Sequence, residues 1–346
     1  MIQKNRPHII LIILDSARRD MFGCYGHPGG LTPHMDSLAS EGLLLTDHYA
    51  AGCGSSQAHV SLFLGQHPTR HGMVHNLAEM NQPIVALPYL LRGLGYRSFG
   101  HCMASFIPPV GHEELFGFDE LLYPGKKQAF KKRPLQFQVL DRLRRYPVFW
   151  TTLKNLYTKL MGEERKIRAY AHLFDGTASL DYLFAKFKSE SPTGPIFAYT
   201  TLLHPHTPYY PPKWCLDRVF KGEKIDKLSF KIQSHLHAWM NGDYGEAPSA
   251  IDSMRKCYQA ELLYADHLVG QFAEKMKKAG WLENTIFIVT SDHGELFGEH
   301  GLLNHGASVW EELFSNSLPD PLSRKICGRY PHGISDFRDG SGADPF

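Results

Sequence analysis

The chain has 346 residues, of which 43% are hydrophobic and 21% charged, and its formal net charge is +2. This composition is ordinary for a soluble globular protein with a sizeable core, so we expect one large domain or two modest ones. The small net charge provides no strong field for nucleic acid, which we exclude as a partner. Twenty histidines are a high count and direct attention to a metal or anion site.

The N-terminal segment and the cysteines predict a cytoplasmic protein. The apolar run at residues 9–14 is ended by Asp15 and is too short for the apolar region of a secretory signal. No apolar stretch approaches the roughly 20 residues that span a bilayer. The six cysteines are scattered without a CxxC spacing, which is typical of reduced thiols in the cytoplasm.

The first half of the chain predicts strands that alternate with helices. Residues 9–14 are continuously apolar, which favours a buried parallel strand. After it we expect a helix that is capped at Thr32 and runs through residue 40, a short strand at 43–46, a helix that starts near Ser55 and includes 61–64, a helix at 87–94 and a strand at 96–100.

The second half continues this alternation. We expect a helix at 175–188, a buried strand at 196–203, a long amphipathic helix at 249–280 and another buried strand at 285–290. In the long helix, Ser249 is the expected N-cap and Gly280 the stop. Helices alternating with β-branched apolar strands predict an α/β layered fold with a mostly parallel sheet.

Two segments differ from their surroundings. Residues 126–168 hold thirteen Lys or Arg with interleaved aromatic residues. This pattern fits either a solvated helical face with its core side or a basic insert that recruits an anionic substrate or a membrane surface. The tail at 314–346 is rich in Ser, Pro, Gly, Asp and Arg without apolar periodicity, which indicates loop or disorder.

Acidic and imidazole side chains follow the first and last predicted strands. Asp15 ends the first strand, and Asp292 and His293 come soon after the last one. Open parallel sheets place their ligand sites at the carboxyl ends of strands, and a carboxylate there is costly unless it is paired or bound to a cation. Oxygen and imidazole donors suit Mn²⁺, Zn²⁺ or Fe²⁺ better than Ca²⁺, which prefers oxygen cages.

Two other segments carry candidate chemistry. Small residues lead into the helix that starts near Ser55, where free backbone N–H groups and the helix dipole favour an anion and a deprotonated nucleophile. After the strand at 196–203 comes the sequence His204-Pro205-His206-Thr207-Pro208. The prolines hold a non-helical backbone there and aim the histidines into a cleft.

Together these segments resemble the sulfatase branch of the alkaline-phosphatase superfamily. The motifs occur in the family's order over roughly residues 6–313: Asp15 with Arg18 and Asp20, Gly23-Cys24-Tyr25-Gly26, Thr32-Pro33-His34-Met35-Asp36, Ser61-Leu62-Phe63-Leu64-Gly65, Pro68-Thr69-Arg70-His71-Gly72, Gly117-Phe118-Asp119, Ser291-Asp292-His293-Gly294-Glu295 and Gly298-Glu299-His300-Gly301. The resemblance implies an alkaline-phosphatase-like layered fold with a mostly parallel central sheet flanked by helices. It implies a catalytic domain over residues 1–313, and a C-terminal subdomain that is truncated or divergent.

The resemblance also implies the roles of single residues. Its metal ligands fall on Asp15, Asp292 and His293, which would hold one divalent cation, Mn²⁺, Zn²⁺ or Ca²⁺. Its nucleophile falls on Ser55, with Cys53 as the alternative if the alignment carries a gap. The positions that bind the ester oxygens and protonate the leaving group fall on His206 and His305, and the position of a substrate-binding Asn falls on Asn76. In the mechanism that we expect, His59 and Asn76 contact the equatorial oxygens of the ester.

The chain also departs from the family pattern. The Cys/Ser-x-Pro-Ser-Arg signature reads Ser55-Ser56-Gln57-Ala58-His59, so the formylglycine modification of Ser55 is doubtful. The Asp-His pair is similar to the phosphonate and phosphodiester hydrolases of the branch. The resemblance implies a metal-dependent hydrolase of sulfate esters, acting through Ser55 on an anionic ester. The alternatives are a phosphodiester or phosphonate ester hydrolase or phosphoryl transferase with unmodified Ser55, and a non-catalytic truncated relative. Nothing in the sequence indicates an oligomeric state.

Overall fold

A computed structural model describes residues 6–75, 78, 80, 85–103, 116–122, 163–171, 175–191, 194–234, 247–306 and 308–314. Its centre is a five-stranded sheet in the order β3-β2-β4-β1-β5, in which every pair is parallel. The strands are β1 His8–Leu14, β2 Arg97–Cys102, β3 Glu120–Leu122, β4 Ile196–Leu202 and β5 Thr285–Ser291, and a separate antiparallel pair joins β6 Leu296–Phe297 to β7 Leu303–Asn304. The predicted α/β fold with a mostly parallel sheet is confirmed.

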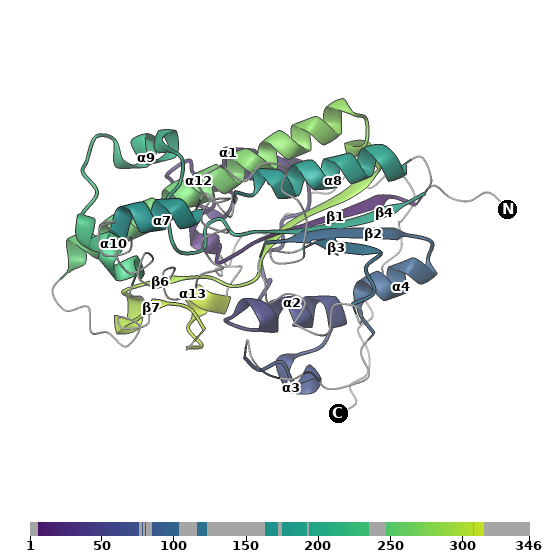
Figure 1. Cartoon of the computed structure of the whole chain (residues 1–346), viewed down its shortest axis with the longest axis horizontal. Helices are drawn as coiled ribbons and strands as arrows, with labels where there is room; N and C mark the ends of the chain where they lie inside the picture. The colour runs from purple at the N-terminus through teal and green to yellow at the C-terminus, as the bar shows by residue number, and fades with distance from the viewer. Residues whose placement is uncertain are drawn as a thin grey trace, which may run out of the picture.

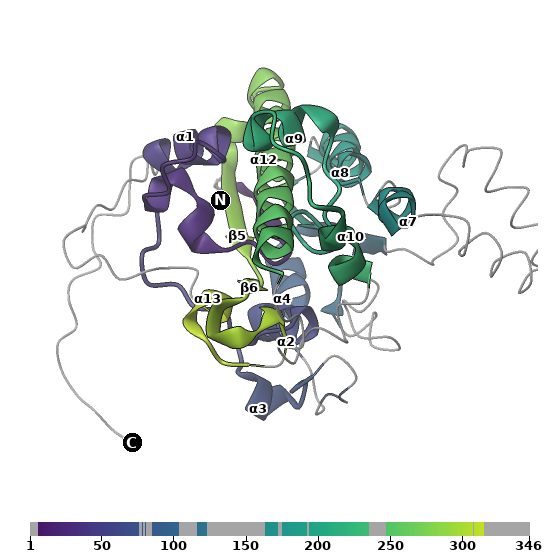
Figure 2. The same ribbon diagram turned by 90° about the vertical axis from the view of Figure 1, so that its left-hand side faces the viewer.

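Helices cover both faces of this sheet, so the molecule has three layers (Figure 1). The helices are α1 Pro33–Glu41, α2 Ser55–Leu64, α3 Pro68–His71, α4 Leu87–Gly93, α7 Glu163–Ala171, α8 Thr177–Glu190, α9 Lys213–Phe220, α10 Lys227–Ser234, α12 Pro248–Lys278 and α13 Glu311–Phe314. Short 3₁₀ turns lie at Arg19–Met21, Gly23–Tyr25, Leu282–Asn284 and Glu299–Gly301. Helices α1, α8, α9 and α12 lie on one side of the sheet, and α2, α3 and α4 on the other (Figures 1 and 2).

Strand β1 supplies side chains to both layers of the core. Ile10, Ile12 and Leu14 belong to the cluster under α8 and α12, whereas Leu11 and Ile13 belong to the cluster under α2 and α4. Side chains alternate across a strand, so a continuously apolar strand fits only where both faces are covered. This explains why residues 9–14 show no polar alternation.

Some local predictions were wrong. Residues 43–46 form no strand. Ser249 does not cap α12, because the helix already begins at Pro248 and the Ser249 hydroxyl donates to Asp226 instead. Strand β5 is half-exposed rather than buried: Ile286 is 45% exposed and Ile288 is 39% exposed. A strand at the sheet edge presents apolar residues to solvent that the same sequence would bury in the centre.

Three predictions concern residues beyond this description. Residues 126–162 of the basic insert and 315–346 of the tail lie outside the described residues, and the division into a domain at 1–313 and a tail stays a prediction. Among the described residues, no helix is both long enough and apolar enough to cross a membrane.

Candidate active site

The first and last strands of the sheet bring two carboxylates together. Strands β1 and β5 are parallel neighbours, and the register pairs Leu14 with Ser291, the last residue of each. The next residues, Asp15 and Asp292, therefore leave the sheet side by side at its carboxyl edge, although 276 positions separate Ser16 from the Asp292 carboxylate to which its backbone N–H donates. Both carboxylates are buried, with 1% and 3% of the residues exposed.

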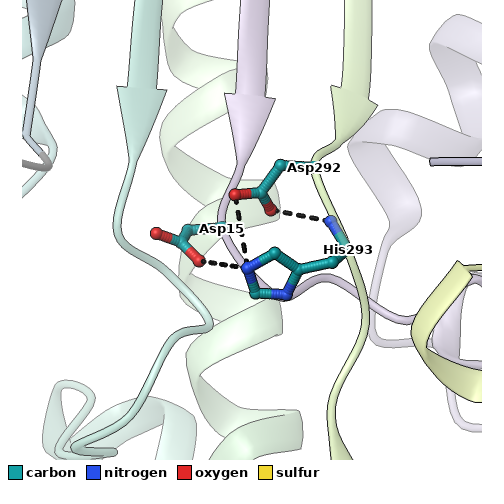
Figure 3. Close-up of side chains that lie close together, drawn as sticks. All are labelled: Asp15, Asp292 and His293. Atoms are coloured by element: carbon teal, nitrogen blue, oxygen red, sulfur yellow. Dashed lines mark hydrogen bonds and ion pairs between the residues drawn. The ribbon is translucent and has the colours of Figure 1, made fainter. Parts of the chain in front are cut away.

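His293 completes this group (Figure 3). Its Nε2 lies 3.7 Å from Asp15 Oδ1 and 3.5 Å from Asp292 Oδ2. Its Nδ1–H donates to the Gly294 carbonyl over 3.0 Å, which leaves the Nε2 lone pair directed at the two carboxylates. Burial lowers the pKa of His293, so the ring is neutral, as a metal ligand must be.

The donor set fits a divalent cation. One atom each from Asp15, Asp292 and His293 lies within 4.8 Å of the others. Burial, together with the charge of Asp292, raises the pKa of Asp15 well above its usual range. Asp292 Oδ1 accepts from the backbone N–H groups of Ser16 and His293, but Oδ2 is buried and has no hydrogen-bond partner among the described residues. A cation held by these three residues would satisfy Oδ2 and offset the repulsion between the carboxylates.

Ser55 places a hydroxyl beside this group. It is the first residue of α2, after the extended Gly54, and its Oγ lies 3.1 Å from His293 Nε2. The helix N-terminus adds free backbone N–H groups and a positive dipole end at the same place. Cys53, the alternative nucleophile, is half-buried, and backbone groups of Gly306 and Ser308 contact its thiol. The structure thus brings Ser55 to the candidate ligands.

His206 and His305 form a row with His293. The His305 ring centroid lies 4.2 Å from that of His293 and 5.1 Å from that of His206. Nδ1–H of His206 donates to the Thr207 carbonyl, so its Nε2 is available to a ligand. Burial and the neighbouring His206 lower the pKa of His305 to about 3. His206 precedes α12 in the chain and His305 follows it, so two distant segments supply adjacent imidazoles.

His59 lies next to the site, but its two ring nitrogens face protein groups. The ring is fully buried, with Nδ1 2.8 Å from the Ser55 carbonyl and Nε2 3.2 Å from Thr201 Oγ1. Nδ1 is also 3.7 Å from Asp292 Oδ2. In this arrangement His59 braces the first turn of α2, and its predicted contact with substrate stays a prediction. Asn76 lies outside the described residues.

Sequence reasoning assigned no role to three residues that hold the site in place. The Tyr258 hydroxyl donates to the Ser16 carbonyl and accepts from Arg18 N–H, over 2.9 Å and 2.7 Å, which fixes the turn after Asp15. The Glu295 carboxylate is buried between Tyr209 and His305, and burial raises its pKa to about 7. Glu261 of α12 binds the His206 loop, defined as residues 203–209, through His204. The Asp-His-Gly-Glu sequence was the only available signal for Glu295.

The fold and this site define an alkaline-phosphatase-like α/β protein with a candidate metal centre. A family model described as Sulfatase matches residues 7–318, and the chain belongs to the sulfatase family. The resemblance predicted from the motifs is thereby confirmed.

Curated relatives agree with this family. The arylsulfatase of Clostridium perfringens is 22% identical over 331 residues, which cover 87% of this chain and 66% of that protein. The choline-sulfatase of Rhizobium meliloti is 23% identical and covers 86% of this chain and 59% of that protein. The human N-acetylgalactosamine-6-sulfatase is 26% identical, and the alignment covers 83% of this chain and 50% of that protein. The chain thus spans about half to two thirds of the length of these relatives.

Solved structures share the fold. The phosphonate monoester hydrolase of Agrobacterium radiobacter superposes with a TM-score of 0.62 at 20% identity and covers 89% of this chain and 66% of that one. A structure solved in complex with its substrate D-glucosamine-2-N,6-O-disulfate superposes with a TM-score of 0.58 at 17% identity. The superposition covers 87% of this chain and 68% of that one.

Proposed function

We propose that the chain is a metal-dependent hydrolase that cleaves sulfate esters through Ser55. One observation carries the proposal: the Ser55 hydroxyl lies 3.1 Å from His293 Nε2, within the group formed with Asp15 and Asp292. A nucleophile beside a cluster of cation ligands, at a helix N-terminus, is the arrangement that transfer of an anionic ester group requires. The sulfatase names of the relatives support the same reaction class.

Each residue has a part in this reaction. When bound by Asp15, Asp292 and His293, a divalent cation lowers the pKa of a nearby hydroxyl and offsets negative charge on the transferring group. Ser55 Oγ attacks the sulfur, and the bond between sulfur and the leaving oxygen breaks. The proton that Ser55 Oγ gives up passes through water to Nε2 of His206 or His305, and that imidazolium gives it to the leaving oxygen. Water then cleaves the serine ester, which releases sulfate and restores the hydroxyl.

Phosphodiester or phosphonate ester chemistry, including phosphoryl transfer to an acceptor alcohol, is the second candidate. Two observations favour it: the Asp292-His293 pair, and the Ser55–His59 sequence without the Pro and Arg of the formylglycine signature. Formylglycine provides a second hydroxyl that expels sulfate, whereas plain serine must wait for water. A serine phosphoester is easier to turn over than a serine sulfate ester, so an unmodified Ser55 favours phosphorus substrates.

A paired assay separates the two candidates. The purified protein is tested with Mn²⁺, Zn²⁺ and Ca²⁺ on 4-nitrophenyl sulfate, bis(4-nitrophenyl) phosphate and an aryl phosphonate monoester, and mass spectrometry of the Ser55 peptide detects formylglycine. Turnover of 4-nitrophenyl sulfate is the expected result, and the peptide mass shows whether Ser55 reacts as plain serine or as formylglycine. Turnover of the phosphorus esters alone, with unmodified Ser55, supports the second candidate.

Variants of the two candidate nucleophiles complete the test. We expect Ser55→Ala to lower kcat by at least about a thousandfold, as removal of a nucleophile does elsewhere, while Cys53→Ala retains activity. Wild-type activity in Ser55→Ala removes Ser55 from the reaction. A folded protein without bound metal or turnover on any of the three esters supports the third alternative, a non-catalytic relative.

Two sequence predictions remain attached to this proposal. The first is contact of the basic insert, residues 126–168, with an anionic substrate or a membrane surface. Its described end supports a place near the site, because the Arg168 guanidinium lies 5.9 Å from the ring centroid of Tyr210, the residue that follows the His206 loop. The second is a cytoplasmic location.

A further inference from the structure

A buried carboxylate, that of Glu295, links His305 to the end of the His206 loop. Glu295 is 1% exposed and follows the ligands Asp292 and His293 in the chain. Its Oε1 lies 3.2 Å from His305 Nδ1, and its Oε2 accepts from the Tyr209 hydroxyl over 3.0 Å. The two oxygens therefore serve two different segments of the chain.

The two contacts of Glu295 constrain different parts of the same row of rings. A bond at His305 Nδ1 turns that edge of the ring toward Glu295, so Nε2 on the opposite edge remains for a ligand. The Tyr209 bond fixes the end of the His206 loop, because the backbone N–H of the same residue also donates to Gln233 Oε1 over 2.7 Å. His206 and His305 keep a centroid distance of 5.1 Å between these two anchors.

The carboxylate is itself held in place. Arg18 Nη1 donates to the Glu295 carbonyl over 2.9 Å and to Glu299 Oε1 over 2.8 Å. The same guanidinium forms a two-point pair with Asp20. A side chain that is buried and fixed at its backbone can hold its partners within a few tenths of an ångström, which is the accuracy that proton delivery needs.

We propose that Glu295 is the positioning residue of the leaving-group side: it holds His305 by Nδ1 and the His206 loop by Tyr209, so that both imidazoles meet the leaving oxygen. Glu295 touches neither the nucleophile nor the transferring group and acts through the two histidines. The inference rests on the proposed ester hydrolysis, and it assigns to the last residue of the Asp-His-Gly-Glu motif a role separate from metal binding.

Kinetics of Glu295→Met and Glu295→Gln test this role on the metal-loaded protein. The methionine fills the space but accepts from neither partner, and we expect kcat to fall by about ten- to a hundredfold with KM unchanged, as for other residues that orient a catalytic group. The loss is larger for phenyl sulfate than for 4-nitrophenyl sulfate, because the poorer leaving group needs the proton more. The glutamine keeps an acceptor for His305 and restores most of kcat.

Two further variants separate positioning from packing. In a His305→Ala background, Glu295→Met costs much less than in the wild type, because the residue through which it acts is gone. Glu312→Met is the matched control: it removes a Glu–His contact of 3.1 Å with His300 at the surface, and kcat stays at the wild-type value. Equal losses on both leaving groups, or full additivity with His305→Ala, overturn the proposal.

A readout independent of turnover keeps the two proposals apart. In the Zn²⁺-loaded protein, the His305 ring gives a single set of ¹³C–¹H correlations with contacts to His293, and these broaden or split in Glu295→Met. Unchanged His305 signals in that variant overturn the positioning role even where no ester is cleaved. If the wild type cleaves no ester while the signals split as expected, the proposed hydrolysis fails and the positioning of His305 stands. Should Glu295→Met not fold, Tyr209→Phe removes one of the two bonds, and a displaced His206 with lowered kcat is the expected result.

Discussion

At the scale of single residues, the site is a balance of buried charges. Asp15 and Asp292 are nearly inaccessible and lie within reach of one neutral imidazole. Two buried carboxylates at this separation repel each other, and without a counter-charge they destabilise the fold. Asp15 bears more of this repulsion than its partner, because its pKa is raised by burial and by Asp292.

This balance predicts how metal and mutation affect stability. Metal at a hundred times its dissociation constant should stabilise the wild type by about 2.7 kcal/mol. Asp15→Asn should lose that response, and in the presence of a chelator it should unfold at or above the wild-type temperature, since one of two repelling charges is gone. Thermal melts with EDTA and with Mn²⁺ measure both effects. Asp217→Asn, at an exposed pair with Lys213, should respond to metal like the wild type; a full metal response in Asp15→Asn would exclude Asp15 as a ligand.

The sequence pointed to these residues for a local reason. Asp15 and Asp292-His293 each follow an apolar strand, and parallel strands gather their carboxyl ends at one edge. The sequence could not predict the roles of Glu295, Tyr258 and Glu261, because each contacts a residue far away in the chain. Glu295 contacts Tyr209 across 86 positions and Tyr258 contacts Ser16 across 242. The periodicity of a sequence does not predict contacts between residues so far apart in the chain.

At the scale of elements, the long helix α12 anchors the loop that carries His206. Glu261 is 2% exposed; its Oε1 accepts from Tyr210 N–H over 2.7 Å, and its Oε2 lies 2.5 Å from His204 Nδ1. The same helix carries Tyr258 before Glu261 in the chain and Asp266 after it. Asp266 accepts from the backbone N–H groups of His34 and Met35 and so caps α1, whereas the expected cap was Thr32.

The anchor at Glu261 predicts a loss of stability and of activity together. Glu261→Ala leaves the partly buried His204 ring and the Tyr210 N–H without their acceptor, and we expect the free energy of unfolding to fall by about 3 to 5 kcal/mol. The His206 loop would lose its register, so kcat should fall as well. Urea unfolding and ester turnover measure the two effects. Glu261→Gln keeps an oxygen for Tyr210 and should cost clearly less than alanine; equal losses would mean that packing alone holds the loop.

The elements themselves were largely predictable. Long apolar periodicities predicted α8 and α12, and continuous apolar runs predicted β1 and β4. The predicted ends of these elements differ from the observed ends by one or two residues. The short strand expected at 43–46 was wrong, because three or four apolar residues form a strand only where a neighbouring strand pairs with them. In the structure this segment runs along the surface, where Leu43 and Leu45 are 49% and 53% exposed.

At the scale of the whole molecule, buried imidazoles are spread through the core. Burial lowers the pKa of His59, His71, His101, His293 and His305. Below the ordinary value of 6.5 the unfolded chain binds protons at these positions and the folded protein does not, so stability falls as the pH falls. The carboxyl groups of Asp15, Asp266 and Glu295 act in the opposite direction. Burial raises the pKa of Asp15, that of Asp266 to about 6 and that of Glu295 to about 7, so the folded state binds protons there more readily.

The five histidines outnumber these three carboxyl groups, and we expect the metal-free protein to lose stability from pH 7 to pH 5. Each buried histidine adds a slope of up to about 1.4 kcal/mol per pH unit below its unfolded pKa. Urea unfolding at several pH values, with chelator present, measures the slope. His101 is not one of the candidate metal ligands and is paired with Ser179, so His101→Gln should reduce the slope by up to that amount. A slope unchanged by His101→Gln would show that this ring titrates normally in the fold.

By itself, the sequence determined the α/β alternation, the membership of the sulfatase family and the short list of candidate ligands, because these depend on local periodicity and on short ordered motifs. Only the tertiary structure decided that β5 lies at the sheet edge with Ile286 and Ile288 half-exposed, that both nitrogens of His59 face protein groups, and that Glu295 joins His305 to Tyr209. The physical reason is that strand order and side-chain orientation come from the packing of distant segments against one another. A linear pattern records which residues prefer to be buried, but not which neighbours they will have.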